Sequence, residues 1–450
     1  MSKTISIRKG YDIKMKGEAS ETTADFQTPS VFAVKPTDFK DLTPKLALKA
    51  GAEVKAGEAL FFDKDRPSIQ FTSPVSGEVT EVRRGAKRKI LEVVVLADKE
   101  IKYKDFGKAT PASLSAEEIK TRVLESGCWP FITQRPYGCV ANPEAAPKAV
   151  FISGFNSAPL AANISYLLKG NEADFNTGLE AVTKMAGTSV YLGLSADGSV
   201  ASVLKEAKAE KNTFKGPHPA GNVGVQIHHT APVNKEETVW TVTPQDLVII
   251  GRLFNQGHFD ARRTIAIAGS EVSTPQYVNT MIGASLEGLT TEYVKGNNAR
   301  IISGNVFTGE QIARDGFLGF YADTISAIPE GNQTDFMGWV LPGFGKFSVS
   351  KTFSAFLSPN KKYDLNTGMH GEERAFVVSG EYEKVFPFDI YPQFLLRAIL
   401  TRNVEKMEEL GIYEVVDEDF ALAEVICTSK IPLQKIVNEG LSFLKKEMGH

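Results

Sequence analysis

The stretch GAEVKAGEALFFDKDRPSIQFTSPVSGEV, residues 51–79, sets the fold that we expect for the N-terminal part of this chain. Its short apolar runs are separated by AG, KAG, DRP and SG, and the same pattern extends on both sides, from Pro44 to Asp98. Many short strands joined by glycine and proline turns at regular spacing are typical of a small sandwich or barrel. Residues 1–105 are therefore predicted to form an all-β domain.

The order of strands and turns in this part is similar to that of a biotinyl- or lipoyl-carrier sandwich. In the lipoyl pattern, the modified lysine lies at a hairpin tip midway between two symmetric halves. Lys64 follows the AG turn too closely and Pro74 comes too late, so we interpret Lys64 as a turn lysine. The basic run RRGAKRK, residues 83–89, is read as a solvated hairpin tip, with a phosphate or an acidic partner as the alternative.

From residue 106 to 256 strands and helices alternate. KAVFIS (148–153) and SVYLGL (189–194) are predicted to be buried strands. TPQDLVIIGRLFNQG (243–257) supplies a threonine N-cap, a proline at the first helical position and a glycine just past the end. An apolar helix face lies between the two strands and consists of Phe175, Leu179, Val182 and Met185. This order predicts a doubly wound, Rossmann-like α/β domain.

Domains of this kind often bind nucleotides, but the sequence motifs that bind the phosphates are missing here. GFNSAPLAAN (154–163), which follows the first strand, lacks G-x-G-x-x-G and has Pro159 where a helix-opening glycine is needed. The pair Gly345-Lys346 does not complete a Walker sequence, because Phe347 follows it and the upstream glycine is missing. We therefore predict that this chain binds no nucleotide cofactor.

Residues 257–330 return to β character, and residues 331–450 mix aromatic loops with helices. A strand with Ile265 and Ile267, a turn at Pro275, a second strand and a short helix capped by Ser285 resemble a soluble-ligand-binding β-grasp (SLBB-like) module. In the last part, the sequences 391–411 and 432–448 each predict one amphipathic helix. The expected fold class is an α/β multidomain protein with four parts, 1–105, 106–256, 257–330 and 331–450.

Composition excludes several classes of protein. The 450 residues are 42% hydrophobic and carry a net charge of −3, which gives no electrostatic reason to expect nucleic acid. No apolar run approaches the about 20 residues of a membrane-spanning helix, and no secretory signal is visible at the N-terminus. Cys128, Cys139 and Cys427 form no CxxC pair. We expect a cytoplasmic protein without disulfides.

The stretch TFKGPHPAGNVGVQIHHTAPVN, residues 213–234, holds three of the six histidines. Its VGVQIHH segment has strand character, which places His228 and His229 on opposite faces and prevents them from clasping one ion. His218 has no nearby cysteine or carboxylate to complete a ligand set. No metal site is predicted.

Two interpretations of this stretch remain. Gly216, Gly221 and Gly224 beside Lys215 offer backbone amides for a phosphate, although the two prolines at 217 and 219 each remove a donor. We favour a rigid loop that carries His218 close to a ligand or to a neighbouring chain. A ligand or docking role is accordingly predicted for Lys215, His218, Gly221 and His228.

A second candidate is GCWPFITQRPYG, residues 127–138. Flat apolar ligands such as quinones need an aromatic slot and one or two donors to their carbonyl oxygens. Trp129, Phe131 and Tyr137 would form the slot, and Arg135 and Tyr137 would donate. The alternative is an aromatic crossover that seals two domains.

Several strings now indicate a family. FTSPVSGEVTEVRRGAKR, FKGPHPAGNVG, PVN, IGASLEGLT, RIISGNVFTG, FGKFSV, FPFDIYPQFLLR and EDFALAEVIC occur in this order and cover nearly the whole chain. Together they resemble the A subunit of the sodium-translocating NADH:quinone oxidoreductase. The family is distantly similar to the C subunit of the Rnf complex and to the NADH-binding flavoprotein subunit of respiratory complex I.

The resemblance implies a peripheral subunit on the cytoplasmic face of the bacterial inner membrane, within a six-subunit translocase that passes electrons from NADH to quinone and exports sodium ions. Flavins and an iron–sulfur centre would lie on partner subunits, because this chain lacks both the CxxC clusters of the Rnf relative and the glycine-rich loop of the complex I relative. No catalytic residue is expected here. The stretch from Val31 to Asp38, with Val31 and Phe32, is a second quinone-binding candidate that rests on the resemblance.

Overall fold

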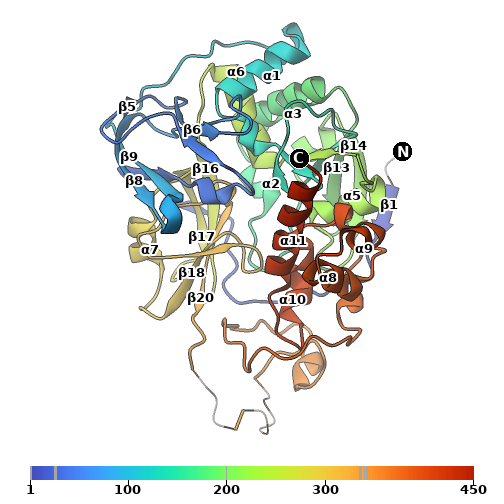
Figure 1. Ribbon diagram of the computed structural model, residues 1–450. Coiled ribbons are helices and arrows are strands. Elements are labelled where there is room, and N and C mark those ends of the chain that lie inside the picture. Colours follow the sequence, from blue (N-terminus) through green and yellow to red (C-terminus); the bar gives the residue numbers. More distant parts are fainter. Residues whose placement is uncertain are drawn as a thin grey trace.

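A computed structural model describes residues 3–24, 28–198, 200–333, 337, 338, 340, 343 and 345–449. Figure 1 shows the N-terminal β structure in blue, the α/β part in cyan to green, a second sheet in yellow and a helical C-terminal part in orange to red. The four regions lie against one another, and their division into domains at the boundaries given above stays a prediction.

The N-terminal part is all-β, as predicted. It holds a four-stranded sheet in the order β3-β9-β8-β5 and a three-stranded sheet in the order β4-β6-β7. Stacked rings of Phe61 and Phe71, with centroids 4.9 Å apart, lie in its core. The strands are β3 (Val31–Val34), β4 (Pro44–Leu46), β5 (Glu53–Val54), β6 (Ala59–Asp63), β7 (Gln70–Thr72), β8 (Gly77–Arg84) and β9 (Ile90–Ala97).

The first two strands leave this barrel and join the other sheets. β1 (Lys3–Ser6) pairs in parallel with β14 (Glu210–Lys215) of the α/β sheet, and β2 (Thr23–Ala24) pairs in parallel with β17 (Gln276–Met281) of the yellow sheet. Residues 3–24 therefore tie the α/β sheet to the yellow sheet.

The α/β sheet has the order β1-β14-β13-β12-β15-β10-β11. Its first five strands are parallel, and the last two are antiparallel additions. The strands are β10 (Thr133–Arg135), β11 (Cys139–Val140), β12 (Val150–Ser153), β13 (Val190–Ser195), β14 (Glu210–Lys215) and β15 (Val239–Thr241). The helices are α1 (Ala116–Glu125), α2 (Ile164–Leu167), α3 (Glu172–Ala186), α4 (Ser202–Glu206), α5 (Val223–Thr230) and α6 (Pro244–Gln256).

This strand order creates a topological switch point. The chain runs from β12 outward through β13 to β14 and then returns to the other side of β12 as β15. In open α/β sheets, ligands bind outside the carboxyl ends of the two strands at such a point.

Helix α6 has the ends that the sequence predicts. The Thr243 side chain accepts a hydrogen bond from the Asp246 amide, Pro244 opens the helix, and Gly257 adopts a left-handed conformation with φ 80°. Gly187 closes α3 in the same way with φ 62°. These caps need only local sequence, which is why the pattern alone located them.

The predicted strand over residues 223–229 is wrong, because these residues form α5. A connection between two parallel strands such as β14 and β15 must cross over a face of the sheet, and a helix does this. Alternating apolar residues over so short a segment do not distinguish a strand from a short buried helix.

The yellow sheet has the order β19-β18-β20-β16-β17-β2. Ile265 and Ile267 lie in its core, as predicted. The predicted cap lies one residue early: Leu286 holds the N-cap position of α7 and makes no side-chain cap bond, while the Ser285 hydroxyl accepts a long hydrogen bond of 3.5 Å from the Glu287 amide. The elements are β16 (Arg262–Ala268), β17 (Gln276–Met281), α7 (Glu287–Tyr293), β18 (Ala299–Ser303), β19 (Glu310–Ile312) and β20 (Thr324–Pro329).

The C-terminal part contains α8 (Pro392–Leu400), α9 (Val404–Glu409), α10 (Ala421–Val425) and α11 (Leu433–Glu447). The single helix predicted over 391–411 is wrong, because the chain breaks between α8 and α9. Arg402 takes a positive φ of 53°, and the Asn403 side chain accepts a bond from the Lys406 amide to start α9. Asparagine is a strong N-cap, so it begins a new helix here.

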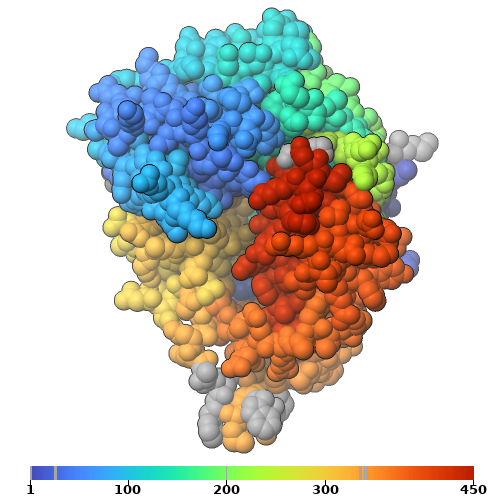
Figure 2. All heavy atoms as spheres, in the orientation of Figure 1, coloured from blue at the N-terminus to red at the C-terminus, as the bar shows by residue number. Residues whose placement is uncertain are grey.

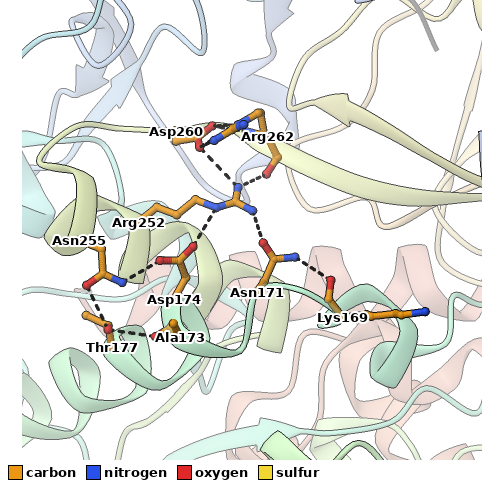
Figure 3. Close-up of polar contacts among 9 residues, drawn as sticks. All are labelled: Lys169, Asn171, Ala173, Asp174, Thr177, Arg252, Asn255, Asp260 and Arg262. Carbon is orange, nitrogen blue, oxygen red and sulfur yellow. Dashed lines mark hydrogen bonds and ion pairs between the residues drawn. The ribbon is translucent and has the colours of Figure 1, made fainter. Parts of the chain in front are cut away.

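A polar joint connects the α/β part to the yellow sheet (Figure 3). The Arg252 guanidinium on α6 donates to the Asn171 side chain at 2.7 Å and to the Arg262 carbonyl at 2.8 Å, and it lies 3.5 Å from the Asp174 carboxylate. Buried Asp260 pairs with Arg262 at 2.5 Å. The positive charges of Arg252 and Arg262 are therefore balanced within the chain by the carboxylates of Asp174 and Asp260.

Candidate functional site

A cavity of about 200 Å³ lies at the switch point. Ser153, at the carboxyl end of β12, and Thr241, at the carboxyl end of β15, both line it. Its aromatic lining consists of Phe131, Phe155, Phe307 and Tyr321, and further polar lining comes from Thr133, His218, Gly221, Asp246 and Asp323. We call it the switch-point cavity. It brings together residues from the two candidate stretches 127–138 and 213–234.

His218 is the lining residue with an unusual environment. Its Nδ1 lies 3.0 Å from the Ser157 hydroxyl oxygen, while its Nε2 is buried without a hydrogen-bond partner. Burial lowers the pKa of the His218 imidazole to about 4, so the ring is neutral at pH 7. A neutral imidazole can donate from one nitrogen while the other accepts.

The loop that carries His218 is held tightly. The His218 backbone amide donates to the Asp12 carboxylate at 2.8 Å, and the Gly221 amide donates to the Ser157 hydroxyl oxygen at 2.9 Å. A Cβ on Gly221 would lie 2.6 Å from the Ser157 amide nitrogen, so only glycine fits there. Lys215 ends β14 and is exposed. These contacts describe a rigid loop; a phosphate role for it stays a prediction.

Trp129 and Tyr137 do not line the switch-point cavity. Trp129 is fully buried, its indole N–H donates to the Ala141 carbonyl at 2.8 Å, and its ring meets Trp240 edge-on. Tyr137 is also buried, which raises the pKa of its phenol to about 12. Of the four residues proposed in this stretch, Phe131 lines the cavity, with its ring stacked on Phe320 at 4.6 Å.

Arg135 joins β10 to the C-terminal part. Its two terminal nitrogens each lie 2.5 Å from a carboxylate, one from Asp419 and one from Glu418. Both Arg135 and Asp419 are buried. The guanidinium is thus occupied by charges within the chain, although Glu418 itself lines the cavity.

Val31 and Phe32 belong to β3, and Phe32 is fully buried. The stretch 31–38 reaches the cavity indirectly, because the Asp38 carboxylate accepts a hydrogen bond from the Phe320 amide at 2.7 Å. Phe320 precedes Tyr321, which lines the cavity. The two quinone-binding candidates therefore meet at the Phe320–Tyr321 wall.

His228 lies on α5, away from this cavity. Its Nδ1 is 2.7 Å from the Glu414 carboxylate, and its Nε2 accepts a bond from the Asp389 amide at 3.2 Å. It therefore docks the C-terminal part onto the α/β sheet within one chain. Across the residues that the structure covers, no group of three or more histidine, cysteine, aspartate or glutamate side chains is arranged to hold a metal ion.

Sequence reasoning missed Phe155, Ser157, Phe307 and Tyr321. The first two follow directly after the predicted strand 148–153, so the rule on carboxyl ends of parallel strands points to them. Phe307 lies between β18 and β19 and Tyr321 between β19 and β20, and only the packing of the yellow sheet against the α/β part brings these two connections to the cavity. Within the described residues, no helix has the length and apolarity that crossing a bilayer requires.

Family models match most of this structure. The NqrA N-terminal barrel-sandwich hybrid domain matches residues 5–98, the NqrA second alpha/beta domain matches 114–259, and the NQRA C-terminal domain, an SLBB model, matches 264–314. These matches confirm the predicted barrel-sandwich, α/β and SLBB-like components.

Relatives match over the whole length. The chain is 34% identical to the A subunit of the Na(+)-translocating NADH-quinone reductase of Vibrio anguillarum, covering 98% of this chain and all of the relative. The corresponding protein of Serratia proteamaculans (strain 568) shares the same identity and coverage. A solved NAD+-reducing [NiFe]-hydrogenase chain, 12% identical, covers 76% of this chain and 62% of its own at a TM-score of 0.38, too low to carry an argument. The resemblance read from the sequence is confirmed: the chain belongs to the NqrA family, the A subunits of the Na(+)-translocating NADH-quinone reductase.

Proposed function

We propose that this chain is a peripheral subunit, on the cytoplasmic face of the bacterial inner membrane, of a six-subunit complex that oxidises NADH, reduces quinone and exports sodium ions. Within that complex we assign it a part in quinone binding, at the switch-point cavity. Flavins and the iron–sulfur centre belong to the partner subunits, and this chain supplies no catalytic residue.

One observation carries the quinone assignment: four aromatic side chains line one cavity together with His218, whose buried Nε2 has no hydrogen-bond partner. In the tautomer in which Ser157 donates to Nδ1, Nε2 carries the proton and can donate to a quinone carbonyl. Ligand pockets of about 300–1,000 Å³ hold drug-sized molecules. A cavity of about 200 Å³ suits a single substituted ring better than a dinucleotide.

The other predicted quinone-binding residues have direct or indirect roles in this proposal. Phe131 contacts the quinone ring, and Arg135 holds the Glu418 carboxylate at the cavity wall. Trp129 and Phe32 belong to the same hydrophobic cluster as Phe131 and Phe320, so their loss would change quinone binding through the packing around the cavity. Tyr137 and Val31 belong to other clusters, and their loss would act from further away.

The second candidate function is a structural docking subunit without a ligand of its own. The burial of Trp129 with its N–H already paired, and the ion pairs of Arg135, favour this alternative. Under it, substitutions at Trp129 or His218 change only assembly or heat stability.

Photolabelling of the assembled complex with a reactive quinone separates the two. We expect labelled peptides from 127–138, 213–234 or 303–321. Ala158→Leu, which adds bulk to a residue that lines the cavity, should abolish this labelling. Ala146→Leu, at an exposed position, should leave it intact.

Labels confined to other subunits would contradict a quinone site on this chain. Labels on this chain that persist unchanged in Ala158→Leu would place the quinone elsewhere on it and contradict the assignment to the switch-point cavity.

A further inference from the structure

Helix α8 is apolar on both faces. Leu395, Leu396 and Ile399 face the core. On the outward face, at a spacing of three residues, stand Tyr391, Phe394, Arg397 and Leu400; the three apolar ones are 67%, 50% and 55% exposed. A helix with apolar side chains on both faces is normally buried, yet in the isolated chain α8 leaves Tyr391, Phe394 and Leu400 half or more exposed.

The segment 376–379 widens this face. The Arg397 guanidinium lies over the Phe376 ring, and the Gln393 side chain donates to the Ser379 hydroxyl at 3.4 Å, so this segment runs beside α8. Between those contacts Val377 and Val378 are both more than half exposed. We call Val377, Val378, Tyr391, Phe394 and Leu400 the α8 patch.

The α8 patch continues into an acidic groove of about 500 Å³ that begins at Tyr391. Asp389, Glu408, Glu409 and Glu414 supply four carboxylates to the lining residues, against the single ammonium group of Lys235. Lys235 is already 2.9 Å from Glu408, Lys406 pairs with Glu409, and His228 is 2.7 Å from Glu414, whereas no ion pair involves Asp389 within the described residues. The groove therefore keeps a surplus of negative charge beside an apolar surface.

We propose that the α8 patch and the acidic groove bind a segment of another subunit of the complex, one that places apolar side chains on α8 and lysine or arginine side chains in the groove. Apolar anchors and opposite charges are the complementarity that such interfaces use. The inference rests on the subunit role proposed above, but not on quinone binding.

Two other occupants fit less well. A two-fold contact between copies of this chain would set the same patch against itself, and would bring two acidic grooves together. An anionic lipid surface would be repelled by the groove carboxylates. A protein segment with both apolar and basic side chains complements the α8 patch and the carboxylates of the acidic groove at the same time.

Cross-linking in the purified complex tests the occupant. With p-benzoylphenylalanine in place of Phe394, light should join this chain to another subunit, at a segment with a lysine or arginine within a few residues. The same probe in place of Leu357, which is 70% exposed but lies outside the patch, should not yield that product. An adduct with lipid or with a second copy, or no adduct, would overturn the proposal.

Affinity gives a second measurement. Phe394→Ser and Asp389→Lys should each weaken binding of the full chain to the complex depleted of it by about 30-fold, as expected for an interface hot spot, and added salt should weaken wild-type binding. Leu357→Ser serves as the matched control. Equal affinity of the variants and the wild type, with unchanged melting temperatures, would refute the docking surface; an intact docking surface with no quinone label would refute only the quinone assignment.

Discussion

At the scale of the residue, His218 is the best defined candidate in the switch-point cavity. Its sequence context suggested a rigid loop, and the structure adds that its ring is buried, paired to Ser157 on one nitrogen and unpaired on the other. The unpaired nitrogen leaves a hydrogen bond for a ligand to complete, because a buried polar group without a partner costs free energy.

The titration of His218 makes the free energy of unfolding depend on pH. Its folded pKa of about 4 lies below the usual 6.5, so the unfolded chain binds more protons between these values and stability falls as the pH drops from 6.5 to 4. The loss should approach about 3 kcal/mol. Urea unfolding of the wild type and of His218→Gln at pH 7.5 and 4.5 measures it. If the free energy of unfolding changed with pH equally in both proteins, the lowered pKa of His218 would be contradicted.

Arg135 shows how a residue that looks like a ligand donor can serve the structure instead. Replacing it with methionine leaves buried Asp419 without its cation, which should cost about 3–5 kcal/mol. Thermal unfolding should show this loss, and Arg135→Met combined with Asp419→Asn should recover part of it. A single variant as stable as the wild type would show that the ion pairs do not hold the C-terminal part.

At the scale of the element, helices α3 and α6 approach each other backbone to backbone. A Cβ added to Gly251 would lie 1.8 Å from the Asp174 carbonyl oxygen, and one added to Gly178 would lie 1.9 Å from that of Leu247. Both glycines stand inside helices, where glycine is otherwise unfavourable by about 1 kcal/mol relative to alanine. The close contact explains their presence.

Gly251→Ala should therefore destabilise the protein despite its better helix propensity. The two helices must separate, and overpacking of this kind costs about 1–3 kcal/mol or more. Chemical denaturation measures the change, with Glu180→Ala on the exposed side of α3 as the control. A gain in stability for Gly251→Ala would mean that α3 and α6 do not pack this closely.

The elements that were predicted correctly are those with local signals. The caps of α3 and α6 and the apolar strands β12 and β13 follow from residues that are neighbours in the chain. The failures, α5 predicted as a strand and α8–α9 predicted as one helix, come from short segments. There, the crossover requirement and a single N-cap at Asn403 outweigh the apolar pattern.

At the scale of the whole molecule, the packing of distant segments builds the candidate site. Phe131, His218 and Phe307 come from three separate stretches and meet at one cavity. Figure 2 shows the blue, yellow and red regions in contact on one face of the molecule, with the C-terminal helices forming part of that surface. The α8 patch lies in this C-terminal part, and the cavity lies where the α/β part meets the region of the yellow sheet, with Glu418 and Ala421 of the C-terminal part also in its lining.

The order of residues along the chain was enough to establish the fold components, the family, and the lack of nucleotide and iron–sulfur motifs. Turns, caps and periodic apolar residues are local, and a family is identified by strings of residues in order. Which candidates line a cavity became visible only after folding: Trp129 is buried, Arg135 is paired, and Tyr321 lies at the same cavity as His218. The physical reason is that a side chain's access to a ligand depends on what packs over it, and those neighbours are far away in the chain.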